Sequence, residues 1–386
     1  MGGRFALRRL FSSTPPKLPG NFHVKHINFT PLSPRLQVPA TPGDFGAMHT
    51  DHMLEIDFKD GQWQRPEIKA FQDLRMHPFA KVLHYSPTIF EGLKAFRGVD
   101  NEIRMFRIER NMARMLESAK RAALPTFCPV QMEHMIVDLV RKEQEWVPKG
   151  EGTSLYVRPF IMGTDGSLGV ATATEAKLCV VCSPVGPYYK TGWSPISLYA
   201  NPAFVRAAPG GVGAYKMGCN YAPTIWLNER ANQVGCLQVL WLWGKNEWLT
   251  EAGVMNVFVY WRNKDNELEL VTPPLKQGLI LPGVTRESIL MLAREWGEFK
   301  VSERYPKMRE LAAASKEGRL LEVFGAGTAA VVSPVSRIMY IPKDSKEPSI
   351  IDIPTQKDPL FKRIHATITG IQYGKIDRPE WVRIVD

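Results

Sequence analysis

The chain has 386 residues, 44% of them hydrophobic, so it can bury a large core, and we expect two domains. Its formal charge of +10 would suit a nucleic-acid-binding protein, but its lysines and arginines form no basic tract. We therefore expect small anionic ligands and no nucleic-acid partner. No apolar run approaches the roughly 18 residues that a membrane helix needs, so we expect no membrane insertion.

The first 43 residues contain no aspartate or glutamate. Phe5, Leu7, Leu10 and Phe11 interleave with a cluster of three arginines, and serines follow. This arginine-rich, acid-free and amphipathic pattern is typical of a mitochondrial transit peptide. We predict a transit peptide and N-terminal arm over 1–43 and a location in the mitochondrial matrix. If the leader is not a targeting signal, the expected location is cytoplasmic.

Residues 44–185 alternate between helix-like and strand-like patterns and predict a smaller α/β domain. Asn111 begins a helix that Pro125 ends, and a second helix carries an apolar face over Met132–Val140. The predicted strands of this region are Ser154–Phe160 and Lys177–Val185.

A predicted linker over 186–199, rich in glycine and proline, leads to a larger domain over 200–386. That domain is richer in strands, and Pro282-Gly283 introduces a helix that Trp296 ends. Asp358 and Pro359 predict the start of the last helix. The other predicted strands are Cys236–Trp243, Glu247–Tyr260 and one after Asn266.

Cys179 and Cys182 have the spacing of a redox or zinc motif but lie inside an apolar, strand-like run. No second pair of cysteines or histidines completes a zinc site, so we predict no metal. We expect both cysteines to be buried and to act as small hydrophobic residues.

Lys216 lies in a glycine-rich stretch, with three glycines before it and one after. Tyr215 and Tyr221 flank it, and no acid lies within ten residues to keep the amine protonated. Burial would lower the pKa of such a lysine from about 10.4 towards roughly 7–8 and make it a nucleophile for carbonyl groups. This setting suits Schiff-base chemistry, although a surface lysine beside a glycine turn has the same pattern.

Glu251 stands 35 residues further on, at the start of an apolar strand pattern. A buried carboxylate is costly unless a positively charged group pairs with it. In a pyridoxal-phosphate enzyme the protonated ring nitrogen is such a group. The alternative is an exposed glutamate at the end of a strand.

The chain resembles the branched-chain amino-acid aminotransferases, which are fold-type IV pyridoxal-phosphate enzymes. The resemblance runs from about Phe45 to the C-terminus. It implies an α/β (α+β) protein with a smaller α/β domain, a larger β-barrel-like domain with helices, and pyridoxal 5'-phosphate between them; we also expect a homodimer. The motifs that carry the resemblance are Phe90–Gly98, Leu155–Pro159, Ser183–Tyr188, the lysine loop and Leu281–Arg286.

The resemblance implies that Lys216 is the catalytic lysine and carries the cofactor. Glu251 would hold the pyridine nitrogen, Tyr221 would hydrogen-bond the phenolic oxygen, and Arg114 would bind the phosphate. By its helical position alone, Arg114 is indistinguishable from a solvated arginine. The N-terminal amides of a helix also form an anion site, and the further phosphate residues expected are Val284, Thr285 and Thr328.

Tyr156 and Arg158 alternate with apolar residues on one strand, so both side chains point to the same face. An arginine there needs a carboxylate partner, either from the substrate or from an unseen acid of the chain. The resemblance assigns the pair to the substrate carboxylate. The other substrate-binding residues that it implies are Phe45, Tyr85, Phe90, Tyr188, Val254 and Ala329.

Two features of the sequence depart from the family pattern. Val254 replaces a common threonine, which removes a hydroxyl near the substrate. Ala330 and Ser333 replace a redox-active cysteine pair, so we expect no thiol regulation by that route.

We predict an aminotransferase that moves the amino group between leucine, isoleucine or valine and 2-oxoglutarate, so the partners are amino acids and 2-oxo acids. An alternative with the same fold is a D-amino-acid aminotransferase or an aminodeoxychorismate lyase. A non-catalytic basic binding protein is the alternative from another class.

Overall fold

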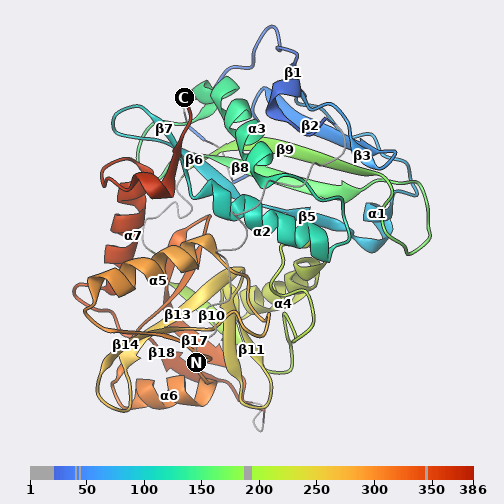
Figure 1. Ribbon diagram of the computed structural model, residues 1–386. Helices are drawn as coiled ribbons and strands as arrows, with labels where there is room; N and C mark the ends of the chain where they lie inside the picture. The colour runs from blue at the N-terminus through green and yellow to red at the C-terminus, as the bar shows by residue number, and fades with distance from the viewer. Residues whose placement is uncertain (1–20, 40, 43–44, 187–193, 344–346) are drawn as a thin grey trace, which may run out of the picture.

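The structure is a computed structural model that describes residues 21–39, 41–42, 45–186, 194–343 and 347–386. Two β-sheets organise the chain, one built mainly from its first half and the other from its second half (Figure 1). Within the described residues, no helix is long and apolar enough to cross a membrane.

Within the described residues the first sheet has ten strands, with β1, β4, β2, β9, β8, β6, β7 and β19 in order along its path. Its core strands β8 and β9 pair antiparallel over their whole length. The strands are β1 (Asn28–Phe29), β2 (His52–Lys59), β3 (Gln62–Trp63), β4 (Glu67–Ala70), β5 (Thr88–Phe90), β6 (Leu93–Arg97), β7 (Ile103–Phe106), β8 (Ser154–Gly163), β9 (Ala176–Val185) and β19 (Val382–Ile384).

The second sheet has nine strands in the part of the chain that the structure describes, ordered β12, β11, β10, β17, β16, β13, β14 and β15, with β18 paired to β17. An additional pairing between β12 and β13 closes part of it into a ring, which confirms the predicted barrel-like sheet. The strands are β10 (Ile196–Ala200), β11 (Gln238–Trp243), β12 (Trp248–Ala252), β13 (Met255–Arg262), β14 (Leu268–Thr272), β15 (Lys300–Glu303), β16 (Leu320–Gly327), β17 (Val331–Tyr340) and β18 (Ser349–Asp352).

Helices α2 and α3 pack against the first sheet, while α5 and α7 lie beside the second (Figure 1). One apolar cluster joins the two halves, because Phe96 and Phe106 of the first sheet share it with α5 and α7. This packing holds the two sheets together around the site described below. The helices are α1 (Lys81–Tyr85), α2 (Ile108–Arg121), α3 (Pro129–Lys142), α4 (Ala222–Gln233), α5 (Val284–Trp296), α6 (Met308–Lys316) and α7 (Leu360–Gln372).

The predicted strands and helices agree with the structure in most places. The helix expected to begin at Asn111 starts three residues earlier, and α5 ends at Trp296 as predicted, with Gly297 in the left-handed conformation. The single strand predicted over Glu247–Tyr260 is wrong, because the chain turns tightly at Gly253 and forms two antiparallel strands. The sequence patterns did not reveal α4 or α6.

The predicted domain limits stay a prediction. Residues 187–193 of the predicted linker lie outside the described part of the chain, and β10 begins within the linker range, at Ile196. The last strand, β19, pairs with β7 of the first sheet, so the end of the chain returns to the half from which it started (Figure 1).

Cys179 and Cys182 are buried in β9, as predicted. Burial raises the pKa of the Cys179 thiol to about 12. It also raises the pKa of Cys182 above its ordinary range. Both side chains are therefore protonated, poorly reactive parts of the core.

Candidate active site

Lys216 lies on a loop that is fastened to the first half of the molecule. Its backbone N–H donates to Oγ of Ser118 on α2 (3.0 Å), and its carbonyl accepts from the Phe90 N–H (3.0 Å). The side-chain amine lies 3.2 Å from the Tyr221 hydroxyl and 4.4 Å from the centre of the Phe90 ring. The loop thus directs one amine into an aromatic setting between the two sheets.

The buried position of Lys216 favours its neutral form. Burial lowers the pKa of Lys216 to about 7; Glu91 opposes this shift, whereas Arg114 and Arg158 add to it. The sequence contains no acid close to Lys216, but the fold brings two carboxylates, Glu91 and Glu251, into its surroundings. They do not outweigh burial, so the pKa agrees with the value expected from the sequence.

Glu251 is buried near the end of β12, with 2% of its surface exposed. Its Oε1 accepts from the Leu281 N–H (2.7 Å), and its Oε2 lies 3.1 Å from Nε of Arg206. Burial raises the pKa of Glu251 above its ordinary value although Arg206 opposes the shift. A further positive charge beside this carboxylate would therefore stabilise its ionised form.

Arg206 is a residue of this site that the sequence reasoning missed. Its Nη2 donates to the carbonyls of Gly213 and Leu279 (3.1 and 2.8 Å), so it also fixes the loop before Lys216. It stands ten residues before Lys216, and nothing in the local pattern distinguishes it from a surface arginine.

The N-terminus of α5 points to the same region. Asn256 donates to the carbonyl of Leu281 (2.9 Å), and its Oδ1 fills the space that a Cβ at Gly283 would need. Glycine at this N-cap therefore permits the close approach of β13 to the helix start. The first amides of α5, at Val284 and Thr285, are of the kind that bind an anion.

Arg114 is buried, so the solvated-arginine reading of its helical position is wrong. It forms a two-pronged ion pair with Glu91, at 2.7 Å from Nε to Oε1 and 2.8 Å from Nη2 to Oε2. Its Nη1 donates to the carbonyl of Pro282 (3.0 Å), just before α5. Burial disfavours the ionised form of Glu91, but Arg114 outweighs it and holds the pKa of Glu91 below its ordinary value. Glu91 was missed as a site residue, although the motif that contains it was noticed.

Tyr156 and Arg158 lie together on β8, as their spacing indicates. Nη2 of Arg158 donates to the Tyr156 hydroxyl (2.9 Å), and its guanidinium lies 4.8 Å from the centre of the Phe90 ring. The ring of Phe45 packs edge-on against Tyr156 at 4.8 Å. Nε of Arg158 is buried without a hydrogen-bond partner, and among the described residues Arg158 forms no ion pair. An internal acid is therefore not its partner within the described chain.

The remaining predicted substrate residues lie in other surroundings. Tyr85 is 43% exposed, and its hydroxyl donates to the Leu168 carbonyl (2.5 Å). Val254 is 58% exposed at the turn between β12 and β13. Tyr188 lies outside the described residues.

Two predicted residues, Thr328 and Ala329, directly follow the end of β16. Thr328 lines one small cavity together with Val284 and Thr285, and Lys94 and Gln372 line the same cavity. The carbonyl of the next residue, Ala329, accepts a hydrogen bond from Nζ of Lys94 (2.7 Å).

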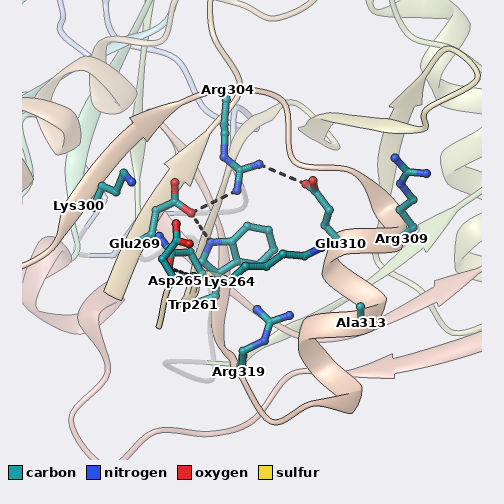
Figure 2. A pocket seen from close by; sticks show the side chains of 11 residues that line it. Trp261, Lys264, Asp265, Glu269, Lys300, Arg304, Arg309, Glu310, Ala313 and Arg319 are labelled. Carbon is teal, nitrogen blue, oxygen red and sulfur yellow. Dashed lines mark hydrogen bonds and ion pairs between the residues drawn. The ribbon is translucent and has the colours of Figure 1, made fainter. Parts of the chain in front are cut away.

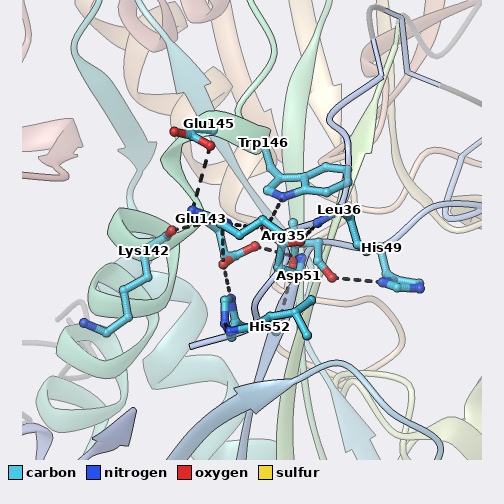
Figure 3. Close-up of polar contacts among 11 residues, drawn as sticks. Arg35, Leu36, His49, Asp51, His52, Lys142, Glu143, Glu145 and Trp146 are labelled. Atoms are coloured by element: carbon cyan, nitrogen blue, oxygen red, sulfur yellow. Dashed lines mark hydrogen bonds and ion pairs between the residues drawn. The ribbon is translucent and has the colours of Figure 1, made fainter. Parts of the chain in front are cut away.

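Asp51, His52 and Glu143 lie close enough together to suggest a metal site (Figure 3). Their ligand atoms, however, are already engaged. Nδ1 of His52 bonds Glu143 (2.5 Å) and Nε2 accepts from the Leu32 N–H (2.9 Å), while Asp51 accepts from Nε of Arg35 (2.6 Å). This network connects the N-terminal arm to α3 and the first sheet, so its role is structural.

A polar pocket of about 510 Å³ lies at the outer edge of the second sheet (Figure 2). Its central arginine, Arg304, is paired with Glu269 and Glu310, each at 3.2 Å. The charge of this central arginine is therefore already neutralised by carboxylates of the protein. The pocket is lined by residues of β13–β15 and α6 rather than by the lysine loop.

Comparison with known proteins identifies the family. Residues 88–338 match the family model described as amino-transferase class IV. The cytosolic branched-chain-amino-acid aminotransferase of Caenorhabditis elegans is 53% identical over 342 residues, covering 88% of this chain and 82% of the relative. The mitochondrial form of Bos taurus is 48% identical over 346 residues, covering 89% and 86%. A structure of the T.th. branched-chain amino acid aminotransferase with pyridoxamine 5'-phosphate superposes with a TM-score of 0.66 at 23% identity, covering 86% of this chain and 98% of the other.

Proposed function

We propose how the residues of this site carry out the reaction of the family to which the chain belongs, the branched-chain-amino-acid aminotransferases of class IV. The chain is an aminotransferase of branched-chain amino acids and uses pyridoxal 5'-phosphate. Its substrates are leucine, isoleucine and valine on one side and 2-oxoglutarate on the other. The observation that carries the assignment of roles is the amine of Lys216, 3.2 Å from Tyr221 and held by its surroundings at a pKa of about 7.

The donor groups of the site fit the cofactor. A lysine amine that is neutral near pH 7 suits attachment to a carbonyl, and a buried carboxylate at Glu251 suits a cationic ring nitrogen. Tyr221 would bond the phenolic oxygen. When bound, the cofactor supplies the electron sink of the reaction. The residues that would hold its phosphate are Arg114, Val284, Thr285 and Thr328.

Lys216 is proposed to move the proton at the substrate's Cα. An amine with a pKa of about 7 can both accept and return a proton near neutral pH, which is the condition for efficient general acid–base catalysis. The Tyr221 hydroxyl keeps the amine in place, and the Phe90 ring shields it from water.

Arg158 and Tyr156 are proposed to bind a substrate carboxylate. The buried Nε of Arg158 has no hydrogen-bond partner within the described chain, so a bound carboxylate would satisfy a donor that is costly to leave unpaired. Phe45 and Phe90 offer aromatic surface next to this pair for a branched aliphatic side chain. The further proposed substrate contacts are Tyr85, Tyr188, Val254 and Ala329.

The test is the visible spectrum of the purified holoenzyme. Adding L-leucine alone should convert the cofactor absorbance to that of its amino form, and adding 2-oxoglutarate should restore it. Lys216→Ala should bind the cofactor but show no turnover. Conversion by D-alanine and not by L-leucine would instead support a D-amino-acid aminotransferase, and a protein that binds no cofactor would support the non-catalytic alternative.

The leader is proposed to direct the protein to the mitochondrial matrix. The support is its composition, since residues 1–43 carry arginines and no acids. Similar proteins include both cytosolic and mitochondrial forms, so family membership does not decide the location. Fusing residues 1–43 to a fluorescent protein, with the clustered arginines changed to glutamine as control, decides it.

The protein is further proposed to act as a homodimer. The exposed apolar side chains Leu168 and Val170, which are 47% and 83% exposed near Tyr85, support this proposal, because a second copy could cover them. Light scattering on the holoenzyme gives the mass directly. A monomeric mass at working concentration would contradict the proposed homodimer.

A further inference from the structure

A cavity of about 660 Å³ opens beside the end of β16, between the turn at Ala329 and Ala330, the start of β17, strand β6 and helix α7. Lys94, Lys362 and Lys375 line it, against one carboxylate, Glu151, which is paired with Lys375. The described wall is therefore positively charged, and this cavity does not include Lys216.

Lys94 contributes a buried ammonium group to the wall. Its residue is 9% exposed, its Nζ donates to the carbonyl of Ala329, and no carboxylate pairs with it among the described residues. Burial lowers the pKa of Lys94 to about 8. Burial and the charge of Lys94 together lower the pKa of the neighbouring His365 to about 4. A bound anion would relieve both effects.

Unlike Lys94, two buried polar groups of the same wall lack a hydrogen-bond partner within the described residues. Oγ of Ser154 and Oε1 of Gln372 have no hydrogen-bond partner among the described residues, and their residues are only 1% and 6% exposed. A buried polar atom is costly to leave unpaired, so such atoms are rare unless a ligand or water meets them. Here two of them share one cavity with an ammonium group that no described carboxylate pairs with.

We propose that this cavity is a second ligand site, which binds a small organic or inorganic anion through Lys94 and Lys362. The anionic group is a carboxylate or a phosphate, since both accept hydrogen bonds from ammonium groups. Ser154 and Gln372 bind a hydroxyl or a protonated oxygen of the same ligand. Apolar side chains such as Phe96 and Val332 line the rest of the cavity and favour a compact ligand.

The test is calorimetric titration of the holoenzyme with inorganic phosphate and, separately, with malonate. We expect saturable binding of at least one anion, weakened about tenfold by Lys362→Ala and by Gln372→Leu. Lys357→Ala removes the same charge just before α7 but does not line the cavity, so it should bind like the wild type. The cofactor absorbance is followed throughout, so that displacement from the cofactor site would be seen.

The two anions distinguish the two ligand sources: binding of phosphate alone indicates a phosphate ligand, and binding of malonate alone a carboxylate. Absence of saturable binding for both would overturn the proposal, as would equal affinity in all variants. Binding that Arg158→Met abolishes, while Lys362→Ala and Gln372→Leu retain it, would assign the anion to the active site and also overturn it. None of these outcomes depends on transaminase activity.

Discussion

Replacing Arg158 by methionine tests how the site accepts two different side chains. One pocket must hold the apolar side chain of leucine and then the charged side chain of glutamate. Methionine keeps much of the length of the arginine side chain but removes its charge and all its donors. We expect Arg158→Met to damage the glutamate half-reaction far more than the leucine half-reaction.

The magnitude follows from the free donors of Arg158. Nη2 donates to Tyr156, whereas Nε is buried and has no partner in the described part of the chain. Hydrogen bonds to charged groups contribute about 1.5–3 kcal/mol each, so one to two such bonds to a side-chain carboxylate are worth about 1.5–6 kcal/mol. That range corresponds to roughly one to four orders of magnitude in the rate with glutamate. Leucine has no side-chain charge to lose.

Single-turnover stopped-flow absorbance follows each half-reaction separately from the cofactor spectrum. Tyr156→Phe is the matched control, because it removes the hydroxyl that Arg158 bonds and leaves the guanidinium in place. Equal losses for both amino acids in Arg158→Met would refute this assignment and give Arg158 a role with the α-carboxylate. A loss confined to leucine would refute the whole pocket assignment.

Further predictions concern other groups of the molecule. In cofactor-free protein, Lys216→Met should raise the melting temperature at pH 7, because the folded-state pKa of Lys216, about 7, lies below its unfolded value of 10.5. This gain in melting temperature is largest below pH 7, shrinks as the pH rises and vanishes above about 10.5. Thermal unfolding across this pH range measures it. Glu251→Gln should keep the fold but slow both half-reactions by orders of magnitude, measured by stopped-flow; unchanged rates would rule out a role with the ring nitrogen. Glu91→Gln should destabilise the protein by about 3–5 kcal/mol in urea unfolding, since it leaves a buried arginine without its charge partner. Cys179 and Cys182 should react with a thiol reagent only on unfolding; fast labelling of the native protein would contradict their burial.

The sequence predicts those parts of the site that depend on local patterns. Lys216 is recognisable by its glycines and flanking tyrosines, and Tyr156 and Arg158 share a face because side chains alternate along a strand. The α4 helix could not be found in this way, whereas α6 was overlooked although Met308, Leu311 and Ala314 recur at helical spacing. In α4 only Leu227 and Ala231 are buried, so almost no apolar periodicity marks it.

The charged pairs could not be predicted, because each joins residues that are distant in the sequence. Arg114 meets Glu91 across 23 positions, and Arg206 meets Glu251 across 45. A helical pattern shows only whether a position lies on the apolar stripe, and positions off the stripe are expected to be exposed. A buried arginine with a distant partner does not follow that expectation. Such violations are expected at functional sites, where polar groups are buried for chemistry rather than for stability.

The pKa of Lys216 depends on those same distant pairs. Each carboxylate near the amine is accompanied by its own arginine, Glu91 by Arg114 and Glu251 by Arg206, so neither acts on Lys216 as an isolated charge. Burial is then free to set the pKa near 7, which a lone carboxylate at the same place would prevent by favouring the protonated amine. The arginines therefore have two effects: they hold the two buried carboxylates in place, and they leave the amine of Lys216 able to lose its proton at neutral pH, as its proposed catalytic role requires.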